Sequence, residues 1–389
     1  MKSVEIILRS VALLCYYLSY LVPRKKSKWI FGGATGFNNN SKYLFIEIVE
    51  NHPKIEAYWI GDRKNTELVR RSGYQAYYRY SLKGLWLCLT SKYYIVDHTQ
   101  GCINFWTSGG AKIINLWHGV GWKACLWSNP MHAAYKKKGK WANYVHKLYY
   151  PHLYYKPDLL LSSSPFMTNR FFAPMFELPK EKCIEAEYPR CSFMLKSQEY
   201  ILDHIHKMKA VENEQLIETM RKYKKTILYA PTFRDAQYDF ITESGIDFDD
   251  FNDFLVERNC LFLIKCHPST KINPQLQINR SNIRMLDKYI DSYYIMPFTN
   301  VLVSDYSSIV FDFMRLHRPL ILFPFDIDIY NNGSRTFQID YDELVVGIPR
   351  VNSYSELKIQ LDKTDELQNT YIEKLWKPSK NLIQAIMEL

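Results

Sequence analysis

The sequence of 389 residues lacks the cysteine spacings that mark a disulfide framework or a structural zinc site. Its eight cysteines are scattered and form no Cys-x-x-Cys pair, which argues for reduced thiols in a cytoplasmic protein. His204 and His206 are close in sequence, but residues two apart on the helix predicted here diverge, so we expect no metal site there. The cysteines are Cys15, Cys88, Cys102, Cys125, Cys183, Cys191, Cys260 and Cys266.

Low-complexity tracts and internal repeats at a fixed period are also missing. Hydrophobic residues make up 47% and charged residues 23% of the chain, which is typical of a globular protein with large cores and excludes disorder. Because 389 residues exceed the usual size of a single core, we expect two domains.

The amino terminus lacks an uninterrupted apolar run of the length that crosses a membrane. Residues 4–22 are mostly apolar, but Glu5 and Arg9 interrupt them, and the remainder is shorter than the ~20 residues of a spanning helix. Basic residues at 24–28 follow the apolar run, which is the reverse of the order in a signal peptide. Residues 1–27 therefore predict an amphipathic helix with a cationic anchor on the anionic, cytoplasmic face of the membrane. A buried domain helix is the first alternative, and a helix that spans the membrane is a less favoured one.

Positive charge and aromatic rings, in contrast, are abundant. The formal net charge of +10 favours polyanions, phosphorylated substrates or anionic lipid as partners. Residues 135–156 interleave lysines with tyrosine and tryptophan, a pattern that fits single-stranded nucleic acid, a solvated surface or a second membrane contact. Because no recognised nucleic-acid motif accompanies this segment, nucleic acid is the least favoured of these partners.

Short apolar runs alternate with amphipathic stretches from residue 28 onward, as in the βα units of a parallel sheet. The predicted strands are residues 29–31, 57–60, 93–96, 112–116 and 159–162, and then 226–230, 261–265, 283–286, 301–304 and 320–323. A helical connection rich in Lys and Glu, residues 196–225, separates the two series. This order predicts an α/β fold with two Rossmann-like domains, residues 28–195 and 196–370, that face a central cleft. We expect a final helix within residues 371–389 to pack back across the domains.

A strand that ends in hydroxyl groups and then opens a helix is the strongest single feature. Residues 301–303 form an apolar run that leads into Ser307 and Ser308, where the first helical N–H groups and the helix dipole favour an anion. Asp312 lies four residues beyond Ser308 and so shares its helix face. The alternative is an ordinary N-capped helix, since Ser and Asp are favoured caps.

A histidine follows another predicted strand. His118 comes after residues 112–116 and is followed by Gly119 and Gly121, which permit close approach of the backbone to a ligand. Its unperturbed pKa near neutrality suits the removal of a proton from an alcohol. A structural histidine in a turn is the alternative.

Basic groups end a third strand. Lys265 and His267 alternate at the end of residues 261–265, so we expect them to share one face and to neutralise a diphosphate or a leaving phosphate. A solvated strand end is the alternative here and in the loop that starts with Pro231 and Thr232. These groups all follow predicted strands, at the sheet edge where open α/β sheets bind ligands.

Together these segments resemble the CDP-glycerol glycerophosphotransferases of teichoic acid and capsule synthesis, over roughly residues 28–370. The segments are Trp117-His118-Gly119 with Lys123, Tyr188-Pro189-Arg190, Tyr229-Ala230-Pro231-Thr232-Phe233-Arg234-Asp235, Lys265-Cys266-His267-Pro268 and Ser304-Asp305-Tyr306-Ser307-Ser308 with Asp312. The resemblance implies a GT-B arrangement of two Rossmann-like domains and a peripheral enzyme on the cytoplasmic face of the cell membrane.

The resemblance also implies the site residues, with His118 as the base and His267 as a second catalytic group. The implied CDP-glycerol-binding residues are Gly119, Val120, Gly121, Trp122, Arg190, Pro231, Thr232, Lys265, Cys266, Ser307, Ser308 and Asp312. Two departures concern the identity of the transferred polyol. Glu187 and Cys191 stand where the family more often has Gly and Asn, and residues 330–349 lack the aromatic Arg-Gly-Phe-Tyr-Phe-Asp type run.

The expected reaction is transfer of glycerol phosphate from CDP-glycerol to a hydroxyl group of a lipid-linked (polyprenyl diphosphate) saccharide or a growing poly(glycerol phosphate) chain, with release of CMP. CDP-ribitol or another activated polyol or sugar is the alternative donor, and a non-catalytic basic protein that binds nucleic acid is the least favoured reading. With so many donor groups the sequence requires no metal cofactor, and Mg²⁺ stays an open alternative. Homo-oligomer formation is also left open.

Overall fold

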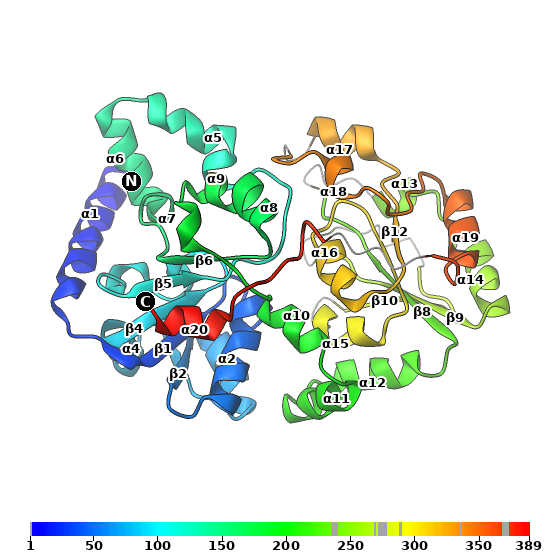
Figure 1. Cartoon of the computed structure of the whole chain (residues 1–389), viewed down its shortest axis with the longest axis horizontal. Helices are drawn as coiled ribbons and strands as arrows, with labels where there is room; N and C mark the ends of the chain where they lie inside the picture. Colours follow the sequence, from blue (N-terminus) through cyan, green and yellow to red (C-terminus); the bar gives the residue numbers. More distant parts are fainter. Residues whose placement is uncertain are drawn as a thin grey trace. The chain divides into compact units, whose positions relative to one another are not determined.

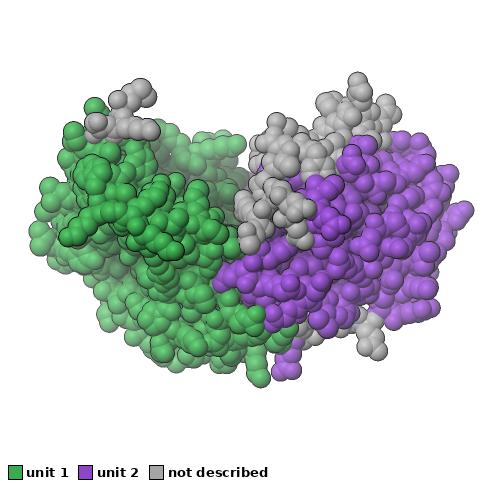
Figure 2. Space-filling view, turned by 90° about the horizontal axis from the view of Figure 1, so that it is seen from above, with its two compact units in different colours: residues 1–120, 124–192, 374–389 green, residues 121–123, 193–373 purple. Residues whose placement is uncertain are grey.

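The computed structural model describes residues 2–234, 240–267, 270, 278–287, 290–333, 337–367 and 373–389. Asp235 and Pro268 of the sequence motifs lie outside these described residues. The chain forms two compact units, which Figure 2 colours separately. Unit 1 comprises residues 1–120, 124–192 and 374–389, and unit 2 comprises residues 121–123 and 193–373.

Unit 1 is built on a seven-stranded sheet in the order β3-β2-β1-β4-β5-β6-β7, and every neighbouring pair is parallel. The strands are β1 (Lys25–Gly32), β2 (Glu56–Gly61), β3 (Ala76–Tyr78), β4 (Ser91–Val96), β5 (Lys112–Asn115), β6 (Leu159–Ser162) and β7 (Cys183–Glu185). All four residues of β6 are buried, as expected for a parallel strand covered on both faces. One face packs Ile30, Ile60 and Tyr94 against Leu87 of a neighbouring helix.

The helices of unit 1 lie on both faces of this sheet (Figure 1). They are α1 (Lys2–Leu18), α2 (Asn39–Asn51), α3 (Arg63–Arg71), α4 (Leu82–Thr90), α5 (Pro130–Ala133), α6 (Lys140–Tyr149), α7 (Pro151–Tyr154), α8 (Pro165–Met167), α9 (Ala173–Phe176), α10 (Pro189–Met194) and α20 (Leu382–Met387). Both the first helix and the last therefore belong to unit 1, although α10 runs on into unit 2.

Helix α1 keeps its apolar face in solvent. Side chains such as Ile7, Leu8 and Val11 are exposed, and the window Val4–Leu21 has a mean hydropathy of 1.5 with 11% of it buried. Glu5 and Arg9, which interrupt the run, form an ion pair at 3.0 Å one helical turn apart. By length and composition alone this window could cross a membrane. For one helix near the amino terminus, these two properties are weak evidence that it spans a membrane.

Unit 2 is built on a five-stranded parallel sheet in the order β10-β9-β8-β11-β12. Its strands are β8 (Lys225–Ala230), β9 (Cys260–Ile264), β10 (Ile283–Met285), β11 (Val301–Ser304) and β12 (Leu320–Leu322). Its remaining helices are α11 (Gln198–Lys207), α12 (Val211–Met220), α13 (Phe240–Glu243), α14 (Phe248–Glu257), α15 (Ser292–Ile295), α16 (Ile309–Phe313), α17 (Ile327–Gly333), α18 (Tyr341–Leu344) and α19 (Tyr354–Asp362). Phe251 of α14 and Leu357 of α19 join the strand residues in the core.

The predicted α/β class and all ten predicted strands are confirmed, and no predicted strand end is more than four residues from the observed one. The short strands β3 and β7 were not predicted, because three residues at a sheet edge give too little periodicity to read. The expectation that Lys265 is part of a strand is wrong, because β9 ends at Ile264. Lys265 extends the ladder only through its amide, which donates to Tyr229 O at 2.8 Å.

Candidate functional site

His118 lies just beyond the carboxyl end of β5 with its imidazole exposed. Its Nδ1 is 3.4 Å from the backbone carbonyl of Asp97, at the end of the neighbouring strand β4. The ring also packs against His98, with centroids 5.6 Å apart and planes 10° apart, and against Trp117 at 4.2 Å. A proton on Nδ1 would donate to the Asp97 carbonyl, so that Nε2 carries the lone pair that a base needs.

The backbone before and after His118 adopts an unusual conformation. Trp117 has a φ of 50° and Gly119 a φ of 138°, of which only the glycine value is free of strain. The turn is tied to the sheet at its start, where the amide of Leu116 donates to Val96 O at 2.7 Å. The Trp117 amide then donates to Asn115 Oδ1 at 2.9 Å. These bonds direct the His118 side chain into solvent beyond the edge of the sheet.

Arg190 belongs to α10 and is only 1% exposed. Its Nη1 donates to Asn39 Oδ1 at 3.1 Å and to the carbonyl of His118 at 3.0 Å. The resemblance gave Arg190 a role in donor binding, and that role stays a prediction. Its burial favours a role in holding the His118 turn.

Asp97 is a buried carboxyl group next to this turn, to which the sequence did not point. Its Oδ1 accepts the amide of Ala34 at 3.0 Å. Burial raises its pKa to about 7, and the Ala34 amide and the charge of Arg190 only partly oppose this shift. Burial also lowers the pKa of His98, so the neutral imidazole is favoured there. Burial therefore disfavours the charged forms of both Asp97 and His98.

In unit 2, Lys265, Cys266 and His267 follow the end of β9. The Nζ of Lys265 donates to Asp287 O at 2.9 Å, and burial lowers the pKa of this ammonium group. Burial raises the pKa of Cys266 to about 12, which keeps the thiol neutral. The ring of His267 is exposed and lies 5.4 Å from that of Phe233.

Ser307 and Ser308 lie in the turn between β11 and α16 and are half-buried. Within the described part of the chain the Ser308 side chain makes no capping hydrogen bond, and Ser307 Oγ is a long 3.5 Å from the amide of Ile309. This geometry favours the anion-binding interpretation over the N-cap alternative. Asp312 is fully buried, and its Oδ2 accepts the hydroxyl of Tyr293 at 2.7 Å.

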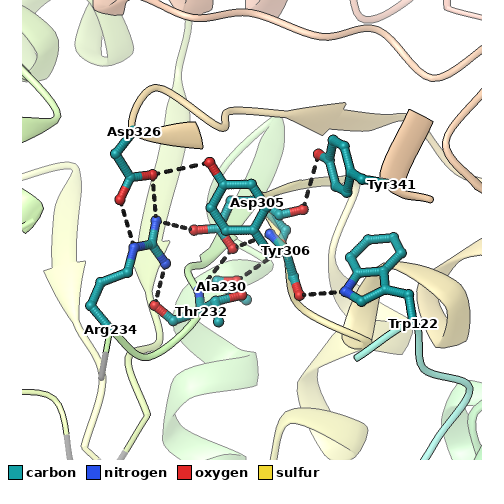
Figure 3. A network of polar contacts seen from close by, with 9 residues as sticks. Trp122, Ala230, Thr232, Arg234, Asp305, Tyr306, Asp326 and Tyr341 are labelled. Atoms are coloured by element: carbon teal, nitrogen blue, oxygen red, sulfur yellow. Dashed lines mark hydrogen bonds and ion pairs between the residues drawn. The ribbon is translucent and has the colours of Figure 1, made fainter. Parts of the chain in front are cut away.

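A buried ion-pair network holds the loops after β8 and β11 together (Figure 3). Arg234, which is 1% exposed, donates from Nη2 to Asp305 Oδ2 and from Nε to Asp326 Oδ2, both at 2.7 Å. The other oxygen of Asp305 accepts the amide of Thr232 at 2.9 Å, and Tyr306 donates its hydroxyl to Asp326 at 3.2 Å. Burial lowers the pKa of Arg234, but the two carboxylates outweigh this and raise it, so the guanidinium stays charged.

Trp122 also contacts the turn after β11. Its indole Nε1 donates to Tyr306 O at 3.2 Å (Figure 3). Its ring packs against Phe311 and Tyr341, with centroids 4.8 and 5.1 Å apart. Trp122 is 1% exposed and belongs to unit 2 with the rest of Gly121–Lys123. Its expected contact with the donor is a prediction that burial disfavours.

The candidate residues thus divide between the units. His118, Gly119, Val120 and Arg190 belong to unit 1, and Gly121, Trp122, Pro231, Thr232, Lys265, Cys266, His267, Ser307, Ser308 and Asp312 belong to unit 2. Among the described residues no group of three or more His, Cys, Asp or Glu side chains could hold a metal ion. The expectations about Mg²⁺ stay predictions.

Comparison with known proteins extends these observations to nearly the whole chain. Residues 14–384 match the model of the family described as CDP-Glycerol:Poly(glycerophosphate) glycerophosphotransferase. The teichoic acid poly(glycerol phosphate) polymerase of Bacillus spizizenii is 27% identical over 84% of this chain and 81% of its own length. The teichoic acid glycerol-phosphate transferase of Staphylococcus aureus is 30% identical over 56% of this chain and 54% of its own length. Against the poly(glycerol phosphate) polymerase of Bacillus subtilis, this chain spans only 44% of the relative.

A solved structure of the wall teichoic acid polymerase TagF aligns over 99% of this chain and 92% of its own, with a TM-score of 0.70 at 20% identity. This likeness confirms the predicted GT-B-like fold class. The family match, in contrast, covers almost every residue from the end of α1 to α20. The chain therefore belongs to the CDP-glycerol:poly(glycerophosphate) glycerophosphotransferase family, a class of transferases that act in teichoic acid synthesis.

Proposed function

We propose that this chain transfers glycerol phosphate from CDP-glycerol to a hydroxyl group of a lipid-linked saccharide or of a growing poly(glycerol phosphate) chain. Beyond the family match, the observation that carries the proposal is the exposed imidazole of His118 at the carboxyl end of a buried parallel strand. Open α/β sheets bind their ligands at this edge. The Nδ1 atom of this imidazole lies 3.4 Å from the Asp97 carbonyl, which leaves Nε2 as the nitrogen that can take a proton.

In the proposed reaction, Nε2 of His118 takes the proton of the acceptor hydroxyl as its oxygen attacks the β-phosphorus of CDP-glycerol. A new phosphorus–oxygen bond forms, the bond to the CMP oxygen breaks, and CMP leaves. His118 then releases the proton to solvent. A positioned base of this kind contributes about 10²–10⁴-fold to the rate.

Unit 2 supplies the groups for the diphosphate. Lys265 and His267 bring nitrogen donors to the end of β9, and Ser307 and Ser308 bring hydroxyl donors to the end of β11. Charge that develops on the leaving phosphate is stabilised most by donors already in place, because they need no reorganisation. We propose that these groups suffice without a metal ion, so that CMP release in excess EDTA should equal that without it.

The proposed donor is CDP-glycerol, with CDP-ribitol as the second candidate. The relatives include ribitol-phosphate polymerases of Staphylococcus aureus, but these match over 65% of this chain against 84% for the first glycerol-phosphate polymerase. Titration calorimetry with each nucleotide separates the two, and tighter binding of CDP-ribitol would overturn the assignment.

The acceptor and the membrane surface are proposed together. Helices α1 and α6 pack on each other: the Ser10 and Tyr144 hydroxyls are 2.8 Å apart, and Arg9 donates to Leu148 O at 3.3 Å. We call their outer face the α1–α6 surface. It exposes Ile7, Leu8, Val11 and Leu14 of α1 and Trp141 and Lys140 of α6, and the segment just before α6 exposes Lys137, Lys138 and Lys136, the last of which is paired with Glu177.

An apolar stripe beside a lysine cluster suits a peripheral protein on an anionic leaflet, which in a bacterium is the cytoplasmic face. We therefore place the enzyme at that face, with a polyprenyl-linked acceptor in the same membrane. Sedimentation with vesicles that contain anionic lipid should carry the protein down, and replacement of the four lysines by glutamine should weaken this binding. Equal sedimentation with neutral vesicles would contradict the electrostatic part of the proposal.

The test of the base is His118→Ala, assayed by CMP release with purified donor and a lipid-linked acceptor. We expect activity to fall by about 10²–10⁴-fold while the affinity for CDP-glycerol is kept. Because the imidazole is exposed, the melting temperature should change little. Full activity in this variant would exclude His118 as the base.

A further inference from the structure

Asn40 lies in the first turn of α2 and is completely buried, yet the proposed chemistry gives it no role. Its side-chain amide donates to the carbonyl of Leu116 at 3.2 Å and to that of Trp117 at 3.0 Å. These are the two peptide groups that come directly before His118. Asn40 thus donates two hydrogen bonds to one turn of another segment and ties that turn to α2.

The two carbonyl groups need an external donor. Trp117 has a left-handed backbone with a φ of 50°, a conformation that costs a bulky residue free energy and persists only where surrounding contacts enforce it. The turn also leaves the regular ladder, because β5 ends at Asn115. Without Asn40, both carbonyl groups would lose this hydrogen-bond donor, and the strained peptide would lose the contacts that hold it.

Arg190 completes the arrangement on the other side of Asn40. The Arg190 amide donates to Asn40 Oδ1 at 3.4 Å, while its guanidinium joins Asn39 Oδ1 to the carbonyl of His118. Three consecutive carbonyl groups, those of residues 116, 117 and 118, are thus fixed by two side chains from α2 and α10. We call Asn40 and Arg190 the turn brace.

We propose that Asn40 is a positioning residue for His118: through the turn brace it sets the direction of the imidazole and so the reach of Nε2 to the acceptor hydroxyl. Asn40 is buried and does not touch the substrate. The inference rests on the proposed role of His118 as the base. A loss of alignment of about 1 Å at a reacting group can cost on the order of 10²-fold in rate.

Two substitutions test this inference. Asn40→Ala removes both donors, and Asn40→Asp keeps the shape and the Oδ1 acceptor for Arg190 but turns a carboxylate toward two carbonyl oxygens. We expect kcat for CMP release to fall about 10–100-fold in Asn40→Ala and further in Asn40→Asp. The Kd for CDP-glycerol should stay within about twofold, because Asn40 is buried and the groups proposed to hold the diphosphate, Lys265, His267, Ser307 and Ser308, belong to unit 2.

The matched control is Asn282→Ala. Asn282 is also buried, and its Nδ2 donates to Cys260 O at 2.8 Å, but at the amino end of β9 in unit 2. Its loss removes the same kind of hydrogen bond and should lower the melting temperature by a similar amount with kcat unchanged. This control separates a loss of stability from a loss of alignment.

Each outcome decides the question. Reduced kcat in both Asn40 variants, with donor affinity kept and the control active, supports the positioning role. Unchanged kcat in the Asn40 variants overturns it, as does a parallel loss of kcat in Asn282→Ala. If His118→Ala is fully active, the proposed base fails, whatever the Asn40 variants show, so the two failures are distinguishable.

Discussion

The loop with His118 in unit 1 and the loop with Ser307 and Ser308 in unit 2 follow interior strands of parallel sheets, but opposite kinds of contact hold them. Neutral amide and carbonyl groups hold the first, with Arg190 as a cationic partner. A buried network of one guanidinium and two carboxylates holds the second. A base must gain and lose a proton, and the fixed charge of Arg190 is bonded to the backbone carbonyl of His118 and not to its imidazole. The serine hydroxyls proposed to bind phosphate need only a fixed position, and permanent ion pairs can hold their loop in place.

The largest effect should come from breaking the charged network. Arg234→Met leaves the carboxylates of Asp305 and Asp326 buried without their cation, which should lower the free energy of unfolding by about 3–5 kcal/mol. Urea denaturation measures this change. A loss below about 1 kcal/mol would show that the network does not hold the unit 2 loops, and the contrast between the units would fail.

A smaller effect on stability is expected from Asp97 in unit 1, where burial favours the neutral form of the carboxyl group. Its pKa is raised from 3.8 to about 7, so the folded chain keeps a proton that the unfolded chain has lost. The free energy of unfolding should therefore fall as pH rises from about 4 to about 7, by roughly 2–4 kcal/mol in total. Above that range the carboxylate is charged in both states and the loss is complete.

Asp97→Asn should remove this pH dependence, because the amide oxygen can still accept the Ala34 amide and the side chain no longer titrates. Urea denaturation of both proteins at pH 5 and pH 8 checks the sign. We expect the variant to be the more stable protein at pH 8. The same slope in both proteins would contradict the raised pKa.

The smallest effect on stability, but a measurable one on binding, should follow from Ser307→Ala and Ser308→Ala. A hydrogen bond to a charged phosphate is worth about 1.5–3 kcal/mol, so the affinity for CDP-glycerol should fall about tenfold or more in each variant. Stability should hardly change, because Ser308 makes no capping bond among the described residues.

Ser304→Ala is the matched control for these two variants. The Ser304 hydroxyl is buried and donates to Ala230 O at 2.6 Å, so its loss should lower stability and leave the donor affinity unchanged. A loss of stability with intact donor affinity in the Ser307 and Ser308 variants would restore the N-cap interpretation.

The sequence predicted the candidate site residues best where they directly follow a strand. His118, Lys265 and Ser307 each follow an apolar run, and such runs are visible locally because a buried parallel strand is apolar throughout. The expectation that Lys265 continues its strand was wrong by one residue. Strand ends are set by the partner strand and not by local sequence.

The contacts that hold these groups could not be read from the sequence, because they join distant positions. Arg234 meets Asp326 across 92 residues, and Asn40 reaches Trp117 across 77. Nothing in the local pattern of a single Arg, Asp or Asn reveals its partner. Arg190 and Trp122 show the same limit, since the motif marks both as important but does not say that their side chains are buried.

Gly121–Lys123 completes the interior of unit 2 although it follows the first 120 residues of unit 1 in the chain. A fragment that begins at residue 193 would lack the indole of Trp122 and would leave Phe311 and Tyr341 facing a hole. During synthesis, the residue that accepts the hydrogen bond of Trp122, Tyr306, is added 184 residues after Trp122. Excising either half as an independent module is therefore a poor strategy, and a permuted chain should keep the tripeptide covalently joined to the half it completes.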